Sequence, residues 1–195
     1  MIAAAAAERA RPTPAPPSDG AVAVLAAGLF ALLVGLYTLT FNGVPATDDE
    51  QLFVVGAQSL SARGTLAAEP LYGNRRVQGE YESVEPLHSA LAALAYRLAP
   101  RLPAGNIPAI FSLSLFYTAL TGVLVFLLGL QAGYSTGAAL SAALFFGVGT
   151  LAFPYARTFF RDTPAMLFLA AALLAYERAL DPARPHPEEA AVGPR

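Results

Sequence analysis

The most constraining feature of this sequence is a stretch of 55 residues, 102–156, that contains no Asp, Glu, Lys or Arg. The 12 basic and 14 acidic residues of the chain all lie outside it. A helix in water needs a polar face, so a soluble domain of this size cannot accommodate so long an uncharged stretch. A membrane-spanning helix needs ~20 mainly apolar residues. The stretch therefore predicts two spans joined by a turn, and it identifies the chain as an integral membrane protein.

Two more apolar segments flank this stretch, so the predicted fold is an all-α, polytopic transmembrane bundle of about four spans. The first segment follows Arg9 and Arg11, as the apolar core of a signal sequence would. Such a core is usually only ~7–15 residues, and an uncleaved first helix is favoured. The four predicted spans are 21–41, 109–130, 136–153 and 163–180.

The chain divides into a membrane region, 21–180, and two polar tails. Residues 1–20 are rich in Ala and Pro and predict a disordered tail, and residues 181–195 form the second tail. The whole chain is only 13% charged and has a net charge of −2, which excludes a basic surface for nucleic acid. It has no Cys, which excludes disulfides and thiolate metal sites.

The long loop 42–106 between the first two spans predicts two amphipathic helices. In the first, 48–63, apolar residues recur at helical spacing, and Thr47 with Glu50 forms a T-x-x-E capping box. The second, 87–99, lies between two prolines and is too short to cross a bilayer. We therefore expect both helices to lie at the membrane interface.

The orientation follows from the arginines. Four spans place both tails on one side, and the loop side carries seven Arg against five on the tail side. The positive-inside rule weakens for loops beyond ~60 residues, so Arg9 and Arg11 before the first span decide the prediction. We expect both tails in the cytoplasm and the loop outside.

Three groups of charged residues could support chemistry. Asp48, Asp49 and Glu50 begin the first amphipathic helix, and such carboxylates could act as a general base or hold a divalent cation. The alternative is structural, because acids in a first turn complement the helix dipole and Glu50 already belongs to the capping box.

The second group includes Glu85, whose alternative is a solvated acidic loop. The third is Arg157, Arg161 and Asp162 before the fourth span, where Asp162 also has the position of a helix N-cap. All three groups fall on the same side of the membrane in the predicted topology. His88 stands without a second histidine nearby and is interpreted as a surface residue.

The order of these motifs resembles the start of membrane glycosyltransferases of the GT-C class. The motifs are P-A-T-D-D-E-Q-L-F after the first span, G-E-Y-E-S-V-E-P-L before the second interfacial helix, and F-F-R-D-T-P-A-M-L-F-L at the fourth span. The closest likeness is to bacterial protein mannosyltransferase-like and aminoarabinose transferase-like members. Asp49 and Glu50 match the early Asp-Glu pair of these enzymes, with Asp48 as the competing register, and Glu85 and Asp162 match later acids.

The resemblance implies sugar transfer from a polyprenyl-phosphate donor at the outer face of a bacterial cytoplasmic membrane. It implies that Asp49 serves as a base or cation ligand, with arginines such as Arg157 and Arg161 near the donor phosphate. Enzymes of this family have many more spans. We therefore expect this chain to be inactive alone and to need a partner chain that supplies the later spans.

Two other functions fit the sequence. A non-catalytic four-span membrane protein would use the same acids only to cap helices. A transporter is the weaker alternative, because no predicted span carries a charged residue near its middle.

Overall fold

The computed structural model describes residues 17–41, 43, 47–68, 71–72, 75–76, 81–82, 86–99 and 106–180. This part of the chain is helical apart from four two-residue strands, and the predicted helical class is confirmed. Its seven helices are α1 (Asp19–Leu39), α2 (Asp48–Arg63), α3 (Pro86–Leu98), α4 (Asn106–Gln131), α5 (Thr136–Gly149), α6 (Ala152–Tyr155) and α7 (Asp162–Ala179).

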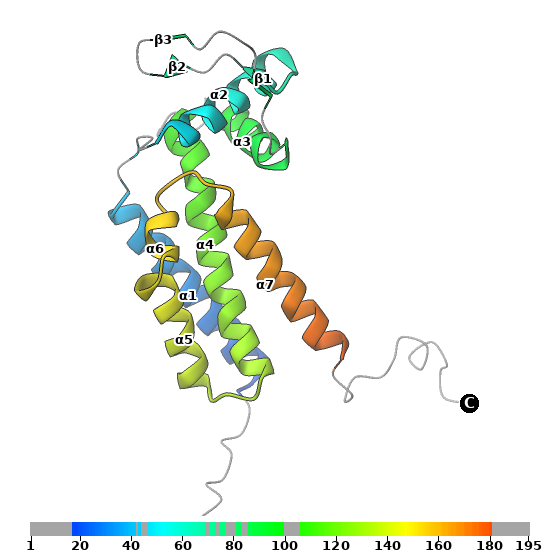
Figure 1. The fold of residues 1–195 in the computed structure, drawn as a ribbon. Coiled ribbons are helices and arrows are strands. Elements are labelled where there is room, and N and C mark those ends of the chain that lie inside the picture. Colours follow the sequence, from blue (N-terminus) through cyan, green and yellow to red (C-terminus); the bar gives the residue numbers. More distant parts are fainter. Residues whose placement is uncertain are drawn as a thin grey trace, which may run out of the picture.

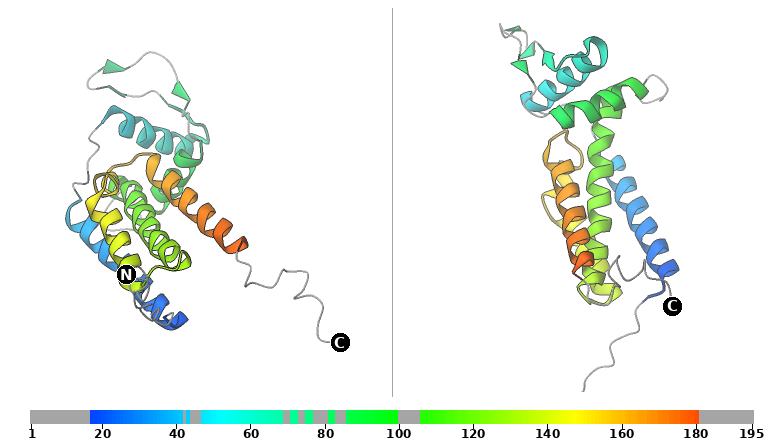
Figure 2. Two further views of the ribbon diagram at one scale, coloured as in Figure 1. Left: turned by 60° about the horizontal axis from the view of Figure 1, so that its bottom comes forward. Right: turned by 90° about the vertical axis from the view of Figure 1, so that its right-hand side faces the viewer.

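Four long helices run alongside one another, and α4 lies at the centre of the group (Figure 1). It packs against α1, α3, α5 and α7. The helices α2 and α3 lie across one end of this bundle (Figure 2). The end of α1 and the beginnings of α4 and α7 all meet at that end, which brings segments far apart in the sequence together.

Within the described residues, two helices are long and apolar enough to cross a membrane, α1 with 21 residues and α4 with 26. Many side chains of α1 lie on the outside, including Val24 at 72% and Leu32 at 57% exposure. A soluble core helix would bury these side chains, so the outer surface indicates membrane association.

The predicted span 136–153 is interrupted in the structure. The helix α5 is apolar but ends at Gly149, and at 14 residues it is only ~21 Å long. Thr150 is extended, with φ −122° and ψ −178°, and α6 begins two residues later. The Thr150 hydroxyl accepts a hydrogen bond from the Ala152 amide, which stabilises this break.

The contact between α1 and α5 depends on a glycine. The Tyr37 hydroxyl is fully buried and donates a hydrogen bond of 2.9 Å to the carbonyl of Gly147. A Cβ at Gly147 would lie 2.6 Å from a methyl group of Leu33. The missing side chain of Gly147 therefore leaves room for Leu33 between α1 and α5.

The two helices predicted in the loop are both present. The helix α2 spans Asp48–Arg63, as predicted, and its capping box forms with both reciprocal hydrogen bonds. Gly64 ends it in the left-handed conformation, with φ 71°, which glycine adopts without strain. The helix α3 begins one residue earlier than predicted, at Pro86, the first-turn position that proline tolerates.

Two short antiparallel ladders between α2 and α3 were not predicted. Strand β2 (Leu71–Tyr72) pairs with β3 (Arg75–Arg76), and β1 (Ala67–Ala68) pairs with β4 (Tyr81–Glu82). In the sequence, β2 and β3 lie between β1 and β4, which is the order of strand segments in a single hairpin.

Candidate functional site

Glu50 joins the start of α2 to the segment that precedes α7. Its side chain is fully buried, and one carboxylate oxygen accepts a hydrogen bond of 2.8 Å from the Phe159 amide. The other oxygen accepts two hydrogen bonds from Thr47, one of 2.9 Å from its amide and one of 3.3 Å from its hydroxyl. The acid that the sequence assigned to the capping box therefore also makes a tertiary contact across 109 residues.

Asp49, its neighbour, has a different environment. Its side chain is exposed in the first turn of α2. Within the described residues the structure gives it no hydrogen bond or ion pair. Asp48 begins the helix, and its side chain lies outside the described part. Of the two described carboxylates in this motif, one thus serves the fold and the other faces solvent.

Arg157 lies at the end of the bundle that carries α2, and its guanidinium contacts other parts of the chain. Its guanidinium donates a hydrogen bond of 3.3 Å to the carbonyl of Thr40, at the end of α1. The same group lies 4.6 Å from the ring centre of Phe153, a cation–π contact. Arg157 therefore links α1 to α6.

Asp162 is the first residue of α7 and not its N-cap, so the structural alternative considered for this residue, helix capping, is not present. Arg161 occupies the cap position with φ −60° and ψ −20°, and the helix has no side-chain cap. Arg161 is in the helical region rather than extended, so the usual capping geometry is not available. The Asp162 side chain is exposed. Its charge can still complement the positive helix N-terminus.

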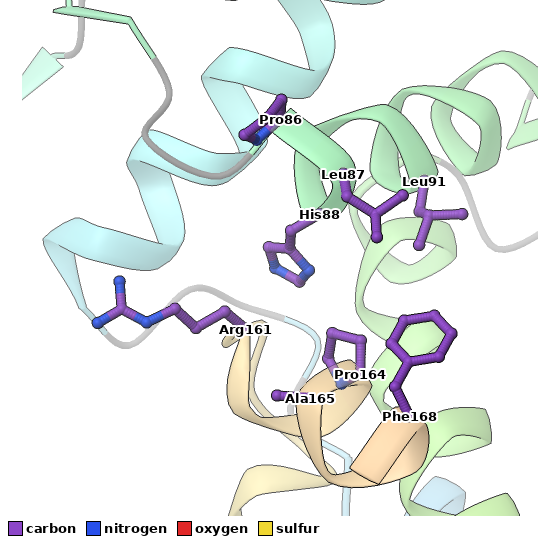
Figure 3. A pocket seen from close by; sticks show the side chains of 8 residues that line it. All are labelled: Pro86, Leu87, His88, Leu91, Arg161, Pro164, Ala165 and Phe168. Carbon is purple, nitrogen blue, oxygen red and sulfur yellow. The ribbon is translucent and has the colours of Figure 1, made fainter. Parts of the chain in front are cut away.

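The structure describes Arg161 but not Glu85, the other two residues predicted for the site. Arg161 is exposed at the entrance to a groove between α3 and α7 (Figure 3). Glu85, which was expected on the same side of the membrane as Asp49 and Asp162, lies outside the described residues. No group of three or more metal-binding side chains occurs in the described part of the chain.

His88 was expected at the surface, and the structure shows that it is buried, with only 4% of its side chain exposed. Its ring stacks on Phe159 at 4.2 Å and meets the edge of Phe53 at 5.0 Å. Burial lowers the pKa of His88 to about 4, although the Phe159 backbone and the Asp162 charge oppose this shift. The ring is therefore neutral near pH 7. Its burial depends on α2 and the segment before α7, which sequence spacing around position 88 does not reveal.

The site thus combines four features at one end of the bundle. They are an exposed carboxylate at Asp49, a buried one at Glu50, two arginines, and an apolar groove that contains a neutral imidazole. This set can accept a proton, pair with an anion and accommodate a hydrocarbon chain.

Comparisons of this chain with protein-family models, with curated proteins and with solved structures found no match.

Proposed function

We propose that the chain is the N-terminal part of a membrane glycosyltransferase of the GT-C type. In this proposal it transfers a sugar from a polyprenyl-phosphate donor on the extracytoplasmic side of a bacterial cytoplasmic membrane. The observation that supports it best is that two adjacent acids, Asp49 and Glu50, have different environments. Glu50 is buried and anchored to Phe159, while Asp49 is exposed at the same end of the bundle as Arg161 and Asp162.

In the proposed reaction Asp49 takes the proton from the acceptor hydroxyl. The acceptor oxygen then forms a bond to the anomeric carbon, and the bond from that carbon to the donor phosphate oxygen breaks. The polyprenyl phosphate leaves with the bonding electron pair, and a guanidinium such as that of Arg161 stabilises its charge. Glu50 acts as a positioning residue, because its hydrogen bonds fix the turn that carries Asp49.

The topology that goes with this proposal has four membrane segments, α1, α4, α5 with α6, and α7. The end that carries α2 and α3 is extracytoplasmic. Because the chain has no Cys, single-cysteine variants report on one position each. Ser83→Cys should react with an impermeant thiol reagent in intact cells. Tyr134→Cys, in the turn between α4 and α5 at the opposite end, should react only after permeabilisation. The reverse pattern would refute the orientation and the site with it.

Activity is tested with and without a partner. Positioning of two substrates supplies ~7–11 kcal/mol of barrier lowering, whereas a general base contributes only ~10²–10⁴-fold. The purified chain alone should therefore give no transfer from a panel of polyprenyl-phosphate sugars. Co-expression with a chain that supplies further spans should give transfer, and Asp49→Asn should abolish it. Full turnover by the chain alone, or by the Asp49→Asn variant of the assembled enzyme, would contradict the proposal.

A non-catalytic membrane protein is the second candidate, because the hydrogen bonds of Glu50 also serve a purely structural role. In that case Asp49 only complements the helix dipole, and its substitution changes stability by ~0.3–1 kcal/mol without affecting any transfer reaction. The Asp49→Asn variant therefore separates the two candidates.

A further inference from the structure

The groove between α3 and α7 has the size and composition of a ligand site. Its volume is about 300 Å³, at the lower end of the range of ~300–1,000 Å³ for small-molecule pockets. Two helices that are far apart in the sequence form its walls (Figure 3). The lining residues are Pro86, Leu87, His88, Leu91, Arg161, Pro164, Ala165 and Phe168.

His88 is the polar group in the interior of this groove. It is 96% buried, since only 4% of it is exposed, and neither Nδ1 nor Nε2 has a hydrogen-bond partner among the described residues. The Phe159 backbone lies near the ring but not in hydrogen-bond geometry. A neutral imidazole has one donor and one acceptor, and leaving both unpaired in the interior is costly. Both nitrogens are covered by neighbouring side chains, so an occupant with a hydrogen-bonding group would remove this cost once those side chains move to admit it.

The charges around the groove select against an anionic occupant. The His88 ring is uncharged at neutral pH, and the negative charge of Asp162 acts on the same position. The guanidinium of Arg161 points away from His88, toward the start of α2 (Figure 3). An anion beside His88 would lose its hydration without gaining a facing positive charge.

The rest of the groove suits a hydrocarbon chain. Leu87 and Phe168 are 60% and 53% exposed, so its apolar rim is open. Burial of apolar surface favours an alkyl chain by ~0.8 kcal/mol for each methylene group.

We propose that this groove binds one hydrocarbon chain of an amphiphile whose uncharged head, a hydroxyl or an ester carbonyl, hydrogen-bonds to His88. A long-chain alcohol and the glycerol ester region of a membrane lipid share this chemistry. The proposal concerns the groove alone and does not depend on sugar transfer.

The test uses the full chain in detergent micelles and a hexadecanol that carries a photoreactive diazirine on its alkyl chain. Crosslinks should saturate and map to peptides of α3 and of the first turns of α7. Unlabelled hexadecanol should displace the probe at about 10-fold lower concentration than hexadecyl sulfate, a permanent anion of the same chain length. Stronger displacement by a monoacylglycerol than by hexadecanol would identify the ester head, and the reverse would identify the alcohol. Both results support the proposal.

Three variants complete the experiment. Ala165→Phe fills the groove and should abolish the saturable crosslinks. Ala172→Phe, two turns later on the same face of α7 and outside the groove, should leave them unchanged. His88→Phe keeps an aromatic ring but removes both nitrogens, and it should lower the affinity for hexadecanol about 10-fold. Equal labelling of the Ala165→Phe variant, or equal displacement by hexadecyl sulfate, would overturn the proposal. Circular dichroism at 222 nm verifies that each variant is folded.

Discussion

Replacement of Glu50 by alanine should detach α2 from the bundle. The substitution removes the acceptor of the Phe159 amide at 2.8 Å and that of the Thr47 amide at 2.9 Å. Hydrogen bonds to charged groups contribute ~1.5–3 kcal/mol each, and a buried amide left without a partner costs ~1–3 kcal/mol. Water can replace the acceptor at the partly buried Thr47 but not at Phe159. We therefore expect α2 docking to lose about 3–5 kcal/mol.

Hydrogen exchange of the full chain in micelles measures this loss directly. Because 1.4 kcal/mol corresponds to a factor of ten, α2 amides should exchange at least ~100-fold faster in Glu50→Ala than in the unmodified chain. Glu50→Gln should lie between the two, because its amide keeps one acceptor but presents a donor to the Thr47 amide. Amides in the middle of α4 serve as the internal reference.

The neighbouring acid provides the matched control. Asp49→Ala removes a carboxylate from the same turn, but one that is exposed. Its effect should stay within ~1 kcal/mol. Equal protection of α2 in Glu50→Ala and Asp49→Ala would refute the inference that the buried carboxylate holds this helix.

Two further predictions concern packing and pH. Gly147→Ala should destabilise the chain by ~1–3 kcal/mol in thermal unfolding followed by circular dichroism, because its Cβ would meet Leu33 at 2.6 Å. Gly35→Ala, with no atom within 4 Å, should be neutral or stabilising, and a reversed order would contradict this account of the α1–α5 contact. The pKa of His88 is lowered to about 4 in the folded chain, against ~6.5 when unfolded, so the unfolded chain binds more protons between these values. The free energy of unfolding should therefore fall as the pH drops below ~6.5, by about 2 kcal/mol at pH 5. The His88→Phe variant should lack this pH-dependent loss. An identical pH dependence in that variant would exclude the histidine as its source.

The helices of this chain follow from local signals that the sequence contains. The boundaries of α2 could be predicted because Thr47, Glu50 and Gly64 fix its two ends by local hydrogen bonds and backbone conformation. The approximate positions of α1 and α4 followed from apolar length alone. The break after Gly149 could not be predicted, because Thr150 and the residues around it are as apolar or small as those of a continuous helix.

The site was harder to predict than the helices. The acids of α2 were recognised as candidates, but their separate environments depend on Phe159, which is 109 residues from Glu50. The burial of His88 depends on the same residue and on Phe53. Neither periodicity nor spacing encodes such contacts, because they arise only when α2, α3 and the segment before α7 pack together.

Phe159 contacts both Glu50, at the acidic turn, and His88, at the groove between α3 and α7. Its amide holds the Glu50 carboxylate, and its ring covers His88 at the groove between α3 and α7. A molecule that entered the groove by shifting the backbone of Phe159 would also move this amide, and the turn that carries Asp49 with it. Events at the two places would then be energetically linked, and the linkage would be reciprocal: whatever is bound beside Asp49 would change the affinity of the groove by the same factor. A single aromatic residue would make occupancy of the groove a signal that the acidic turn can sense.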